Sequence, residues 1–452
     1  MDVITPKRRT PFRKSHGRIT IVVYNRPSDC GGKCLFCIWE KGLTRSTVTS
    51  EDTLMARACN WDPVCQIAQR FKAYGLRRGL GNKYGLAIKG DSFTNHKQEY
   101  LLQYFKSIYD FLNGAPSASF DEAKAMQAHA PDRCVQIQVE TRPDQIDDSW
   151  CQFMLRLGVT TVEIGVQSLD DAVLEINRRG HGVDVVAKAT GLLREYGFEV
   201  GYHMMTGMVG SSVELDVEIL SSRLWEPAFS PDVLKIYPCV LLKDFRAQRQ
   251  LAKYADSPAW QPLDSEAYLA VLIRSFPSFP RYVHVNRIQR LISPETIYHG
   301  PTKYIDRRTF NGVSQCLWQR GVAQSGRDLD GSFEHYTLAS YRQGDGWCVE
   351  AVVDRDVVLG YARMSPADDG GMLIRDVRVL GNMVPVGEAP AAGRGTQHHG
   401  IGKRMVGLME QLAARAGSPA IRVHPADGAS AYFESLGYVD RCDGYLEKIL
   451  AS

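Results

Sequence analysis

A chain of 452 residues is too long for one ordinary hydrophobic core, so we expect one large domain and one smaller domain. The composition, 44% hydrophobic and 23% charged, is typical of a globular enzyme, and no apolar run is long enough to cross a bilayer, which argues against a membrane-spanning protein. The net charge of +3 is the difference between 54 basic and 51 acidic residues, so any surface for nucleic acid must be local.

Residues 1–18 form a basic segment that contains no acidic residue from position 7 onward. Such a run suits phosphate groups, although a solvated tail would have the same composition. The segment lacks the apolar core of a secretory signal, so we expect a cytoplasmic protein with reduced cysteines. The candidate nucleic-acid contacts are Lys7, Arg8, Arg9, Arg13 and Lys14.

Between residues 19 and 311, short β-branched runs alternate with longer segments of helical period, which is the pattern of successive βα units. Six or seven such units predict an α/β domain built as a full or partial TIM-like barrel. In a barrel of this kind the functional residues gather where the strands end. The expected strands cover residues 19–24, 85–89, 135–140, 161–166, 198–204, 233–237 and 282–285.

Three cysteines, Cys30, Cys34 and Cys37, lie within eight residues directly after the first expected strand. Thiolates are the usual ligands of iron-sulfur clusters, and three ligands would leave one iron of a 4Fe-4S cluster free for a small molecule. A zinc site usually takes four ligands, and no second pair follows nearby. The spacing resembles that of the radical SAM superfamily, whose free iron binds S-adenosylmethionine (SAM). A structural cluster and a chance triplet are the alternatives.

Unusual polar residues stand at the carboxyl ends of the expected strands. Charged groups inside a barrel are costly unless they bind something, so their repetition at one level of the fold predicts a binding surface. Structural ion pairs are the alternative interpretation. The residues concerned are Gly90, Asp91, Glu140, Arg142, Glu163, Gln167, His203 and Lys235.

Residues 312–334 are rich in Gly, Ser, Gln, Arg and Asp with weak periodicity, which predicts a linker. A smaller α+β domain is expected over residues 335–452. Its expected strands cover 348–353, 357–364, 372–380 and 420–424, and its expected helices cover 403–416 and 429–436.

The segment Gln397-His398-His399-Gly400-Ile401-Gly402 precedes the first of these helices. Small residues before a helix let backbone N–H groups approach phosphates, so the segment fits the pyrophosphate loop of GNAT acetyltransferases. A Gly-x-Gly turn alone is weak evidence, but the later run from Ala431 to Tyr438 also resembles the GNAT ending. Tyr432 is therefore a further candidate contact for acetyl-CoA. Phe433 stands where many acetyltransferases carry a tyrosine acid, so direct amine acetylation is not assumed.

Several motifs outside the cysteine triplet recur in an order that resembles the Elongator catalytic subunit. They extend over nearly the whole chain, including the basic lead-in. The motifs are ETRPD (140–144), VEIGVQS (162–168), RGH (179–181), GYHMMTG (201–207), LKIYP (234–238) and NRIQR (286–290).

This resemblance implies a tRNA-modifying enzyme with a radical SAM domain and a GNAT domain. A SAM-derived radical would remove hydrogen from the methyl group of acetyl-CoA, and the carbon radical would add to C5 of the wobble uridine, giving a carboxymethyl-type product after thioester cleavage. The implied cofactors are a 4Fe-4S cluster, SAM and acetyl-CoA, with tRNA as partner and room for a homo-oligomer or accessory subunits. By match of position, the catalytic set is Cys30, Cys34, Cys37, Glu140, Arg142 and Lys235, and the cofactor-binding set in the barrel is Phe36, Gly90, Asp91, Glu163, Gln167 and His203.

The chain departs from the family pattern at two points. Only Cys316 is present where the family has a cysteine-rich block, so no zinc site is expected, and Lys89 to Ser92 replace a segment with a double glycine and threonine. These departures leave open an acceptor that is a metabolite or peptide, or a degenerate tRNA-binding scaffold. The remaining cysteines are interpreted as ordinary thiols, namely Cys59, Cys65, Cys134, Cys151, Cys239, Cys348 and Cys442.

Overall fold

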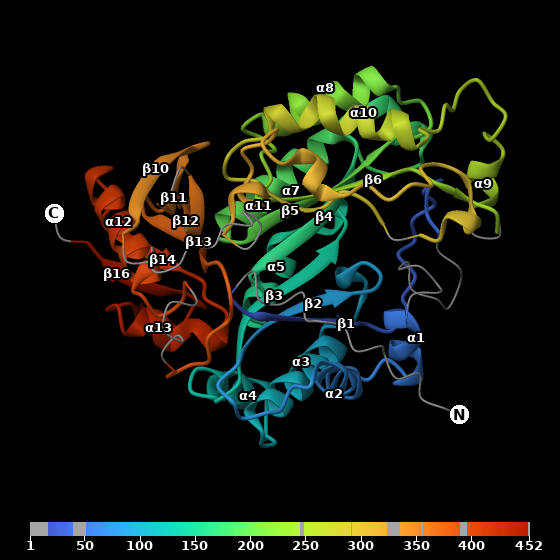
Figure 1. Cartoon of the computed structure of the whole chain (residues 1–452). Helices are drawn as coiled ribbons and strands as arrows, with labels where there is room; N and C mark the ends of the chain where they lie inside the picture. The colour runs from blue at the N-terminus through green and yellow to red at the C-terminus, as the bar shows by residue number, and fades with distance from the viewer. Residues whose placement is uncertain are drawn as a thin grey trace.

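A curved sheet of seven parallel strands forms the core of the first domain (Figure 1). The computed structural model describes residues 17–38, 51–244, 248–290, 292–322, 335–353, 356–388 and 396–450. Within these residues the sheet does not close, because β1 and β8 are its two edges. The strands, in sheet order, are β1 (Ile19–Tyr24), β2 (Lys83–Lys89), β3 (Arg133–Thr141), β4 (Thr161–Gln167), β5 (Glu199–Thr206), β6 (Val233–Pro238) and β8 (His284–Arg287).

This sheet confirms the predicted partial barrel. Every expected strand is present, with bounds that differ by at most two residues from those read from the sequence. Strands β4 and β6 are buried along almost their whole length and are mostly apolar, with Glu163 and Lys235 as their charged residues. The short β7 (Leu241–Leu242) and β9 (Ile297–His299) pair separately and were not predicted.

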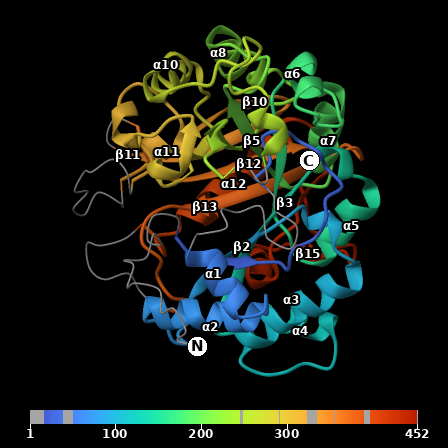
Figure 2. The same ribbon diagram turned by 90° about the vertical axis from the view of Figure 1, so that its right-hand side faces the viewer.

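Helices cover the outer face of the sheet and follow its curve as an arc when the molecule is viewed toward the carboxyl ends of the strands (Figure 2). Capping residues fix where several of them begin. For example, the Asp147 carboxylate accepts a hydrogen bond from Trp150 N (2.8 Å) at the start of α5. The helices are α1 (Glu51–Ala58), α2 (Pro63–Tyr74), α3 (Gln98–Asn113), α4 (Phe120–Gln127), α5 (Asp148–Arg156), α6 (Asp171–Ile176), α7 (Val183–Glu195), α8 (Val213–Ser221), α9 (Arg249–Ala252), α10 (Ser265–Ser275) and α11 (Leu317–Arg320).

The second domain is a mixed sheet of seven strands with α12 packed against it, so the predicted α+β class is confirmed. Three of its strands, β10, β15 and β16, were not predicted. Its elements are β10 (Thr337–Gln343), β11 (Gly346–Val353), β12 (Val357–Pro366), β13 (Met372–Val379), α12 (Ile401–Arg415), β14 (Ala420–Val423), α13 (Ser430–Glu434), β15 (Val439–Asp440) and β16 (Leu446–Ile449). The described residues contain no helix that combines the length and the apolar character needed to span a bilayer.

The second domain packs against the amino ends of the barrel strands (Figure 1). Arg363 Nη1 lies 3.1 Å from Glu199 at the start of β5, and Arg375 pairs with Asp232 just before β6. Asp427, in the turn before α13, accepts a hydrogen bond from the Tyr109 hydroxyl (2.8 Å). The carboxyl ends of the barrel strands are therefore left free of this domain.

Two predictions about local structure need correction. The thiols of Cys59 and Cys65 form a disulfide that joins the end of α1 to the first turn of α2, so these two are not free thiols. The turn that ends α1 brings their Cα atoms within 5.6 Å, a separation that a disulfide can bridge.

The region predicted as a linker also differs from the expectation. It contains α11, where Leu317 is buried and Arg320 pairs with Glu350 and Asp356 of the second domain. The apolar side chains of this short helix and its ion pairs fix it between the domains, a feature that a polar composition concealed. Residues 323–334 lie outside the described residues.

Candidate functional site

The three cysteines of the triplet lie in the loop that follows β1. Cys34 is buried, whereas Cys30 and Cys37 are half-buried, and none of the three is in a disulfide. Cys37 N donates to Cys34 O (3.2 Å), which makes a turn, and Gly31 has a φ of +63° that favours glycine. The sequence therefore folds this loop so that the three cysteines stand directly after the first barrel strand.

Two arginines surround the Cys34 sulfur. Arg179 Nη1 lies 3.6 Å and Arg142 Nη1 lies 3.9 Å from Cys34 Sγ. Arg142 is held in place by Asp144 (2.9 Å) and by the carbonyl oxygen of Arg179 (2.8 Å). Two arginines fixed beside one sulfur of the triplet suit an anionic iron-sulfur cluster, because their positive charge would compensate that of the cluster. Arg142 was predicted as a site residue, but Arg179 was not.

The loop after β2 is tied to the cysteine loop. The Asp91 carboxylate accepts a hydrogen bond from Ser28 N (2.6 Å), and Gly90 has a φ of +136°, which strains any other residue. A Cβ atom at Gly90 would lie 3.4 Å from the carbonyl oxygen of Asn25. Phe36 packs on the edge of a small apolar cluster around Leu241. Gly90 and Asp91 thus lie beside the cysteine loop.

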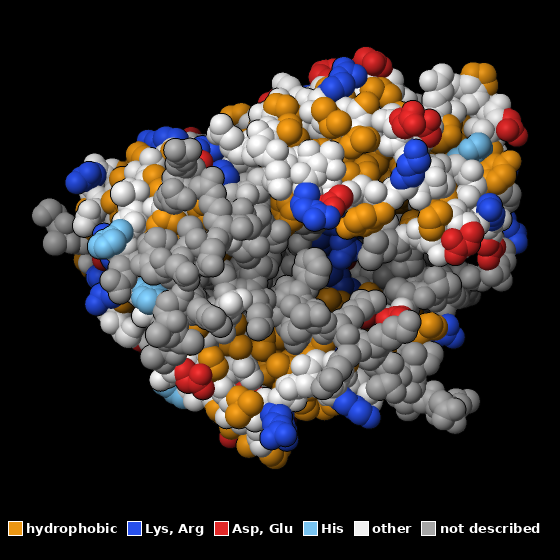
Figure 3. Space-filling model, in the orientation of Figure 1, with side chains coloured by type: hydrophobic (Ala, Val, Ile, Leu, Met, Phe, Trp, Pro, Cys, Tyr) orange, Lys and Arg blue, Asp and Glu red, His pale blue; other side chains and the backbone are white. Residues whose placement is uncertain are grey.

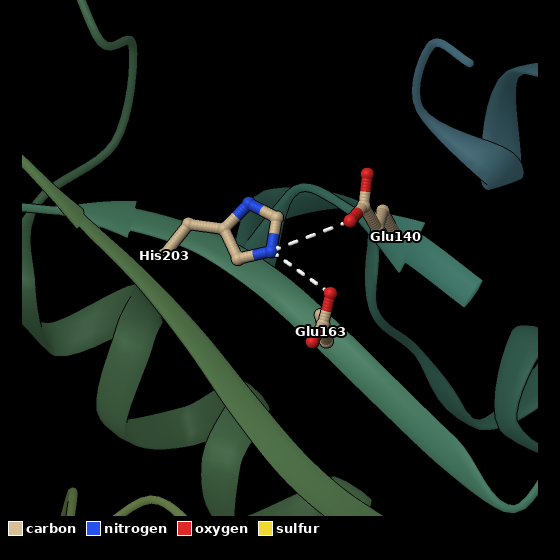
Figure 4. A group of neighbouring side chains, drawn as sticks. All are labelled: Glu140, Glu163 and His203. Atoms are coloured by element: carbon tan, nitrogen blue, oxygen red, sulfur yellow. Dashed lines mark hydrogen bonds and ion pairs between the residues drawn. The ribbon is translucent and has the colours of Figure 1, made fainter. Parts of the chain in front are cut away.

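Five charged or titratable side chains converge inside the barrel, two from the carboxyl ends of their strands and three from the middle of theirs. They come from five neighbouring strands, and we call them the barrel-mouth cluster, which consists of Lys89, Glu140, Glu163, His203 and Lys235. His203 Nε2 lies 2.9 Å from Glu163 Oε2 and 3.5 Å from Glu140 Oε1 (Figure 4). Lys235 Nζ lies 3.0 Å from Glu140 Oε1 and pairs with Glu163. Lys89 pairs with Glu140 and lies 3.5 Å from Glu163.

The charges in this cluster balance, with two carboxylates and two ammonium groups. Burial alone would raise the pKa of Glu140, but Lys235, Lys89 and His203 outweigh it and lower this pKa to about 2. Burial, reinforced by Lys235, lowers the pKa of His203, so its imidazole is neutral at pH 7. The carboxylates and the imidazole could in geometry hold a cation, but the two lysine ammonium groups already neutralise them.

Gln167 lies at the last position of β4 with a φ of +74°, an uncommon conformation for a non-glycine residue. A Cβ atom at Gly165 would come within 2.7 Å of Gln167 Nε2, so the glycine makes room for this side chain. In the orientation of Figure 1, which shows the barrel from the side, Lys and Arg side chains lie within a hollow at the centre of the surface that faces the viewer (Figure 3).

A second site is a cavity of about 560 Å³ between the two domains, at the amino ends of the barrel strands. It is lined on one side by Lys83, Gln136, Thr161 and Glu199, none of which was predicted. Of the predicted acetyl-CoA residues, His399 is exposed and is not among the lining residues. The predicted residues that do line the cavity are Gln397, His398, Gly400, Ile401, Gly402 and Tyr432.

Several features of this cavity suit a phosphorylated thioester. Gly400 caps the 15-residue helix α12 with a φ of +73°, so backbone N–H groups face the cavity at the helix N-terminus. The buried Tyr432 hydroxyl forms no hydrogen bond within the described residues and faces Gly402, where a Cβ atom would lie 2.8 Å from it. Lys83 Nζ donates to Gln397 Oε1 (2.6 Å), and burial lowers the Lys83 pKa to about 8.

Two further predictions concern Phe433 and the basic N-terminal segment. Phe433 is buried in the core of the second domain, where it packs against Tyr438 with ring centroids 5.5 Å apart. It therefore supports the fold of the second domain and also lines the interdomain cavity beside Tyr432. The five basic residues between Lys7 and Lys14 lie outside the described residues, so their contact with nucleic acid stays a prediction.

Comparison with known proteins places these observations in context. Residues 24–220 match the model of the radical SAM superfamily. The chain is 30% identical to the tRNA uridine(34) acetyltransferase of Dehalococcoides mccartyi, over 97% of this chain and 99% of that protein. It is 26% identical to human Elongator complex protein 3, over 99% of this chain and 87% of that protein. The structure of archaeal Methanocaldococcus infernus Elp3 is similar with a TM-score of 0.78 and 27% identity, covering 96% of this chain and all of that one.

Proposed function

Because the chain belongs to the family of tRNA uridine(34) acetyltransferases, we propose that it modifies the wobble uridine of tRNA with a two-carbon unit taken from acetyl-CoA. SAM bound to a 4Fe-4S cluster supplies the radical in this proposal, in keeping with the match to the radical SAM superfamily. The product is a carboxymethyl-type group at C5. Relatives that match over nearly the whole chain favour this function over a metabolite-modifying enzyme or a scaffold.

Cys30, Cys34 and Cys37 would hold the cluster, which when bound supplies the electron that cleaves SAM. Arg142 and Arg179 stabilise negative charge on the Cys34 sulfur. The loop that carries Gly90 and Asp91 lies next to this centre and would contact SAM. Gln397 to Gly402 and Tyr432 would bind acetyl-CoA in the interdomain cavity, apart from the exposed His399.

The observation that carries this proposal is that the cavity and the barrel-mouth cluster lie on one interior surface. Thr161 lines the cavity, and Glu163, two residues further along β4, belongs to the cluster. Side chains two residues apart on a strand face the same side and are about 7 Å apart. On β5, Glu199 and His203 have the same relation over about 13 Å. A thioester held in the cavity would therefore lie on the same interior face as the barrel-mouth cluster.

The test is an isotope experiment with anaerobically reconstituted full-length protein. With SAM, a reductant and acetyl-CoA deuterated on its methyl group, we expect deuterium in 5'-deoxyadenosine and, with tRNA present, a carboxymethyl-type uridine at the wobble position. Mass spectrometry of both products measures the outcome.

The variant C34A should lose both products, because a cluster ligand is missing. C442A, which removes an exposed free cysteine, is the matched control and should keep both. Unlabelled 5'-deoxyadenosine from the wild-type protein, or full turnover by C34A, would contradict the proposal.

A further inference from the structure

The proposed function leaves one step without an assigned residue. After the two-carbon unit is joined to the acceptor, its carbonyl carbon is still bonded to the CoA sulfur, and a carboxylate product requires hydrolysis. Water must form a bond to this carbonyl carbon, the C–S bond must break, and a base must take a proton from the water and return it to the departing thiolate. No external oxidant or reductant is needed for this step.

The location of that base follows from the covalent structure of the intermediate. The thioester carbonyl carbon is bonded directly to the former methyl carbon, which must be beside the radical when the new bond forms. The radical arises at the carboxyl end of the barrel, next to the cysteine loop. The base should therefore belong to the barrel mouth rather than to the interdomain cavity.

From this geometry we propose that His203, oriented by Glu163, is the general base for thioester hydrolysis, an inference that rests on the proposed function. His203 Nε2 is 2.9 Å from Glu163 Oε2, so this nitrogen carries the proton and donates it to the carboxylate. The other ring nitrogen, Nδ1, makes no hydrogen bond with a described residue and is directed away from both carboxylates (Figure 4). About 15% of the side chain is exposed, so water can reach it.

The other groups that face His203 do not suit the role. Lys235 on β6 is only 5% exposed, and the two carboxylates raise its pKa against the effect of burial, so it stays protonated. Glu163 on β4 is only 1% exposed, and Glu140 on β3 is paired with both lysines. Lys89 on β2 donates a hydrogen bond to Glu140.

Two further groups, one on β6 and one on β8, support a neutral imidazole on His203. The Tyr237 ring on β6 packs edge-on against the imidazole at 6.0 Å between centroids. Arg287 on β8 interacts electrostatically with Glu140 and Glu163, which adds positive charge to the same carboxylates. Glu163 thus acts as a positioning residue that selects the tautomer with Nδ1 free, as a carboxylate does for the histidine of a hydrolytic triad.

The experiment compares H203Q with the wild-type protein, since glutamine can still donate a hydrogen bond to Glu163 but offers no basic nitrogen. H203Q should retain deuterium transfer from labelled acetyl-CoA to 5'-deoxyadenosine within about threefold, and should form carboxymethyluridine about 100-fold or more slowly. Quenched reactions should contain tRNA nucleosides still linked to CoA. H129Q, which changes an exposed histidine before β3, should behave as wild type.

The outcomes separate the two proposals. Wild-type protein that transfers no deuterium would refute the proposed function, whatever His203 does. Wild-type transfer together with full carboxymethyl formation by H203Q, or an equal loss of every step in a folded H203Q that retains its cluster absorption, would refute the role of His203 alone. If H203Q fails to fold, H203A with added imidazole replaces it, and the proposal requires imidazole to restore CoA release without changing deuterium transfer.

Discussion

The two ends of the barrel each bury a cluster of charged side chains, but the cations differ. At the amino end, Asp232 and Glu199 are paired with arginines from the second domain and are at most 2% exposed. At the mouth, Glu140 and Glu163 are paired with lysines and a histidine; Glu163 and Lys235 are at most 5% exposed, but Lys89, Glu140 and His203 are 15–23% exposed.

This difference separates a structural cluster from a chemically accessible one. Guanidinium groups keep their charge at any ordinary pH and form bidentate pairs, so the interface of arginine and carboxylate holds the two domains in one arrangement. A histidine can gain or lose a proton near neutral pH, and the partial exposure of His203 lets water reach it. Similar buried charges therefore fix the two domains at one end and, in the proposed reaction, transfer protons at the other.

The largest effect on stability should come from breaking the amino-end cluster. D232N leaves the buried Arg375 without its carboxylate and removes one of the three carboxylates around Arg363, which should lower the free energy of unfolding by about 3–5 kcal/mol. Urea unfolding followed by circular dichroism measures this loss. A loss below about 1 kcal/mol would show that this cluster does not hold the domains.

A smaller loss of stability is expected at the mouth. E140Q should cost about 2–3 kcal/mol at pH 7, because each unit by which the carboxyl pKa is lowered corresponds to about 1.4 kcal/mol, while Lys235 keeps Glu163 as a partner. The Glu140 pKa is lowered to about 2 from 4.5, so its stabilising contribution is complete above pH 4.5 and disappears as pH falls toward 2.

Unfolding free energies of wild type and E140Q should therefore converge between pH 4.5 and 2. A difference that stays constant down to pH 2 would contradict the assignment of this carboxylate.

The smallest effect on stability, expected at an exposed ion pair, is the reference for the other two losses of unfolding free energy. Lys188 and Asp184 pair at 3.3 Å on the surface of α7, with both side chains more than two-thirds exposed. K188A should change the unfolding free energy by less than about 0.5 kcal/mol in the same urea experiment. A loss as large as that of D232N would mean that burial is not what distinguishes the clusters.

Much of the barrel and its mouth could be predicted from the sequence. The period of the βα units placed all the barrel strands, and the polar residues at their ends were recognisable because charge is unusual there. The cysteine triplet was readable because its three ligands are close in sequence.

Contacts between residues that are far apart in the sequence could not be predicted. Lys83 meets Gln397 across 314 positions, and Arg179 reaches Cys34 across 145 positions, so no local pattern identifies either contact. Strand β10 is mostly half-exposed or exposed, and β16 has only four residues, so neither shows a clear alternation. The Cys59–Cys65 disulfide contradicted an expectation based on cellular compartment rather than on geometry.

The unpaired edges of the half-barrel bear on the size of the acceptor. In the described residues β1 and β8 do not pair with each other, and the second domain contacts the amino ends of the strands. A closed ring of strands would admit a ligand only through its rim, which suits small diffusible compounds. A wall interrupted on one side lets a single base enter laterally while the folded polymer that carries it stays outside.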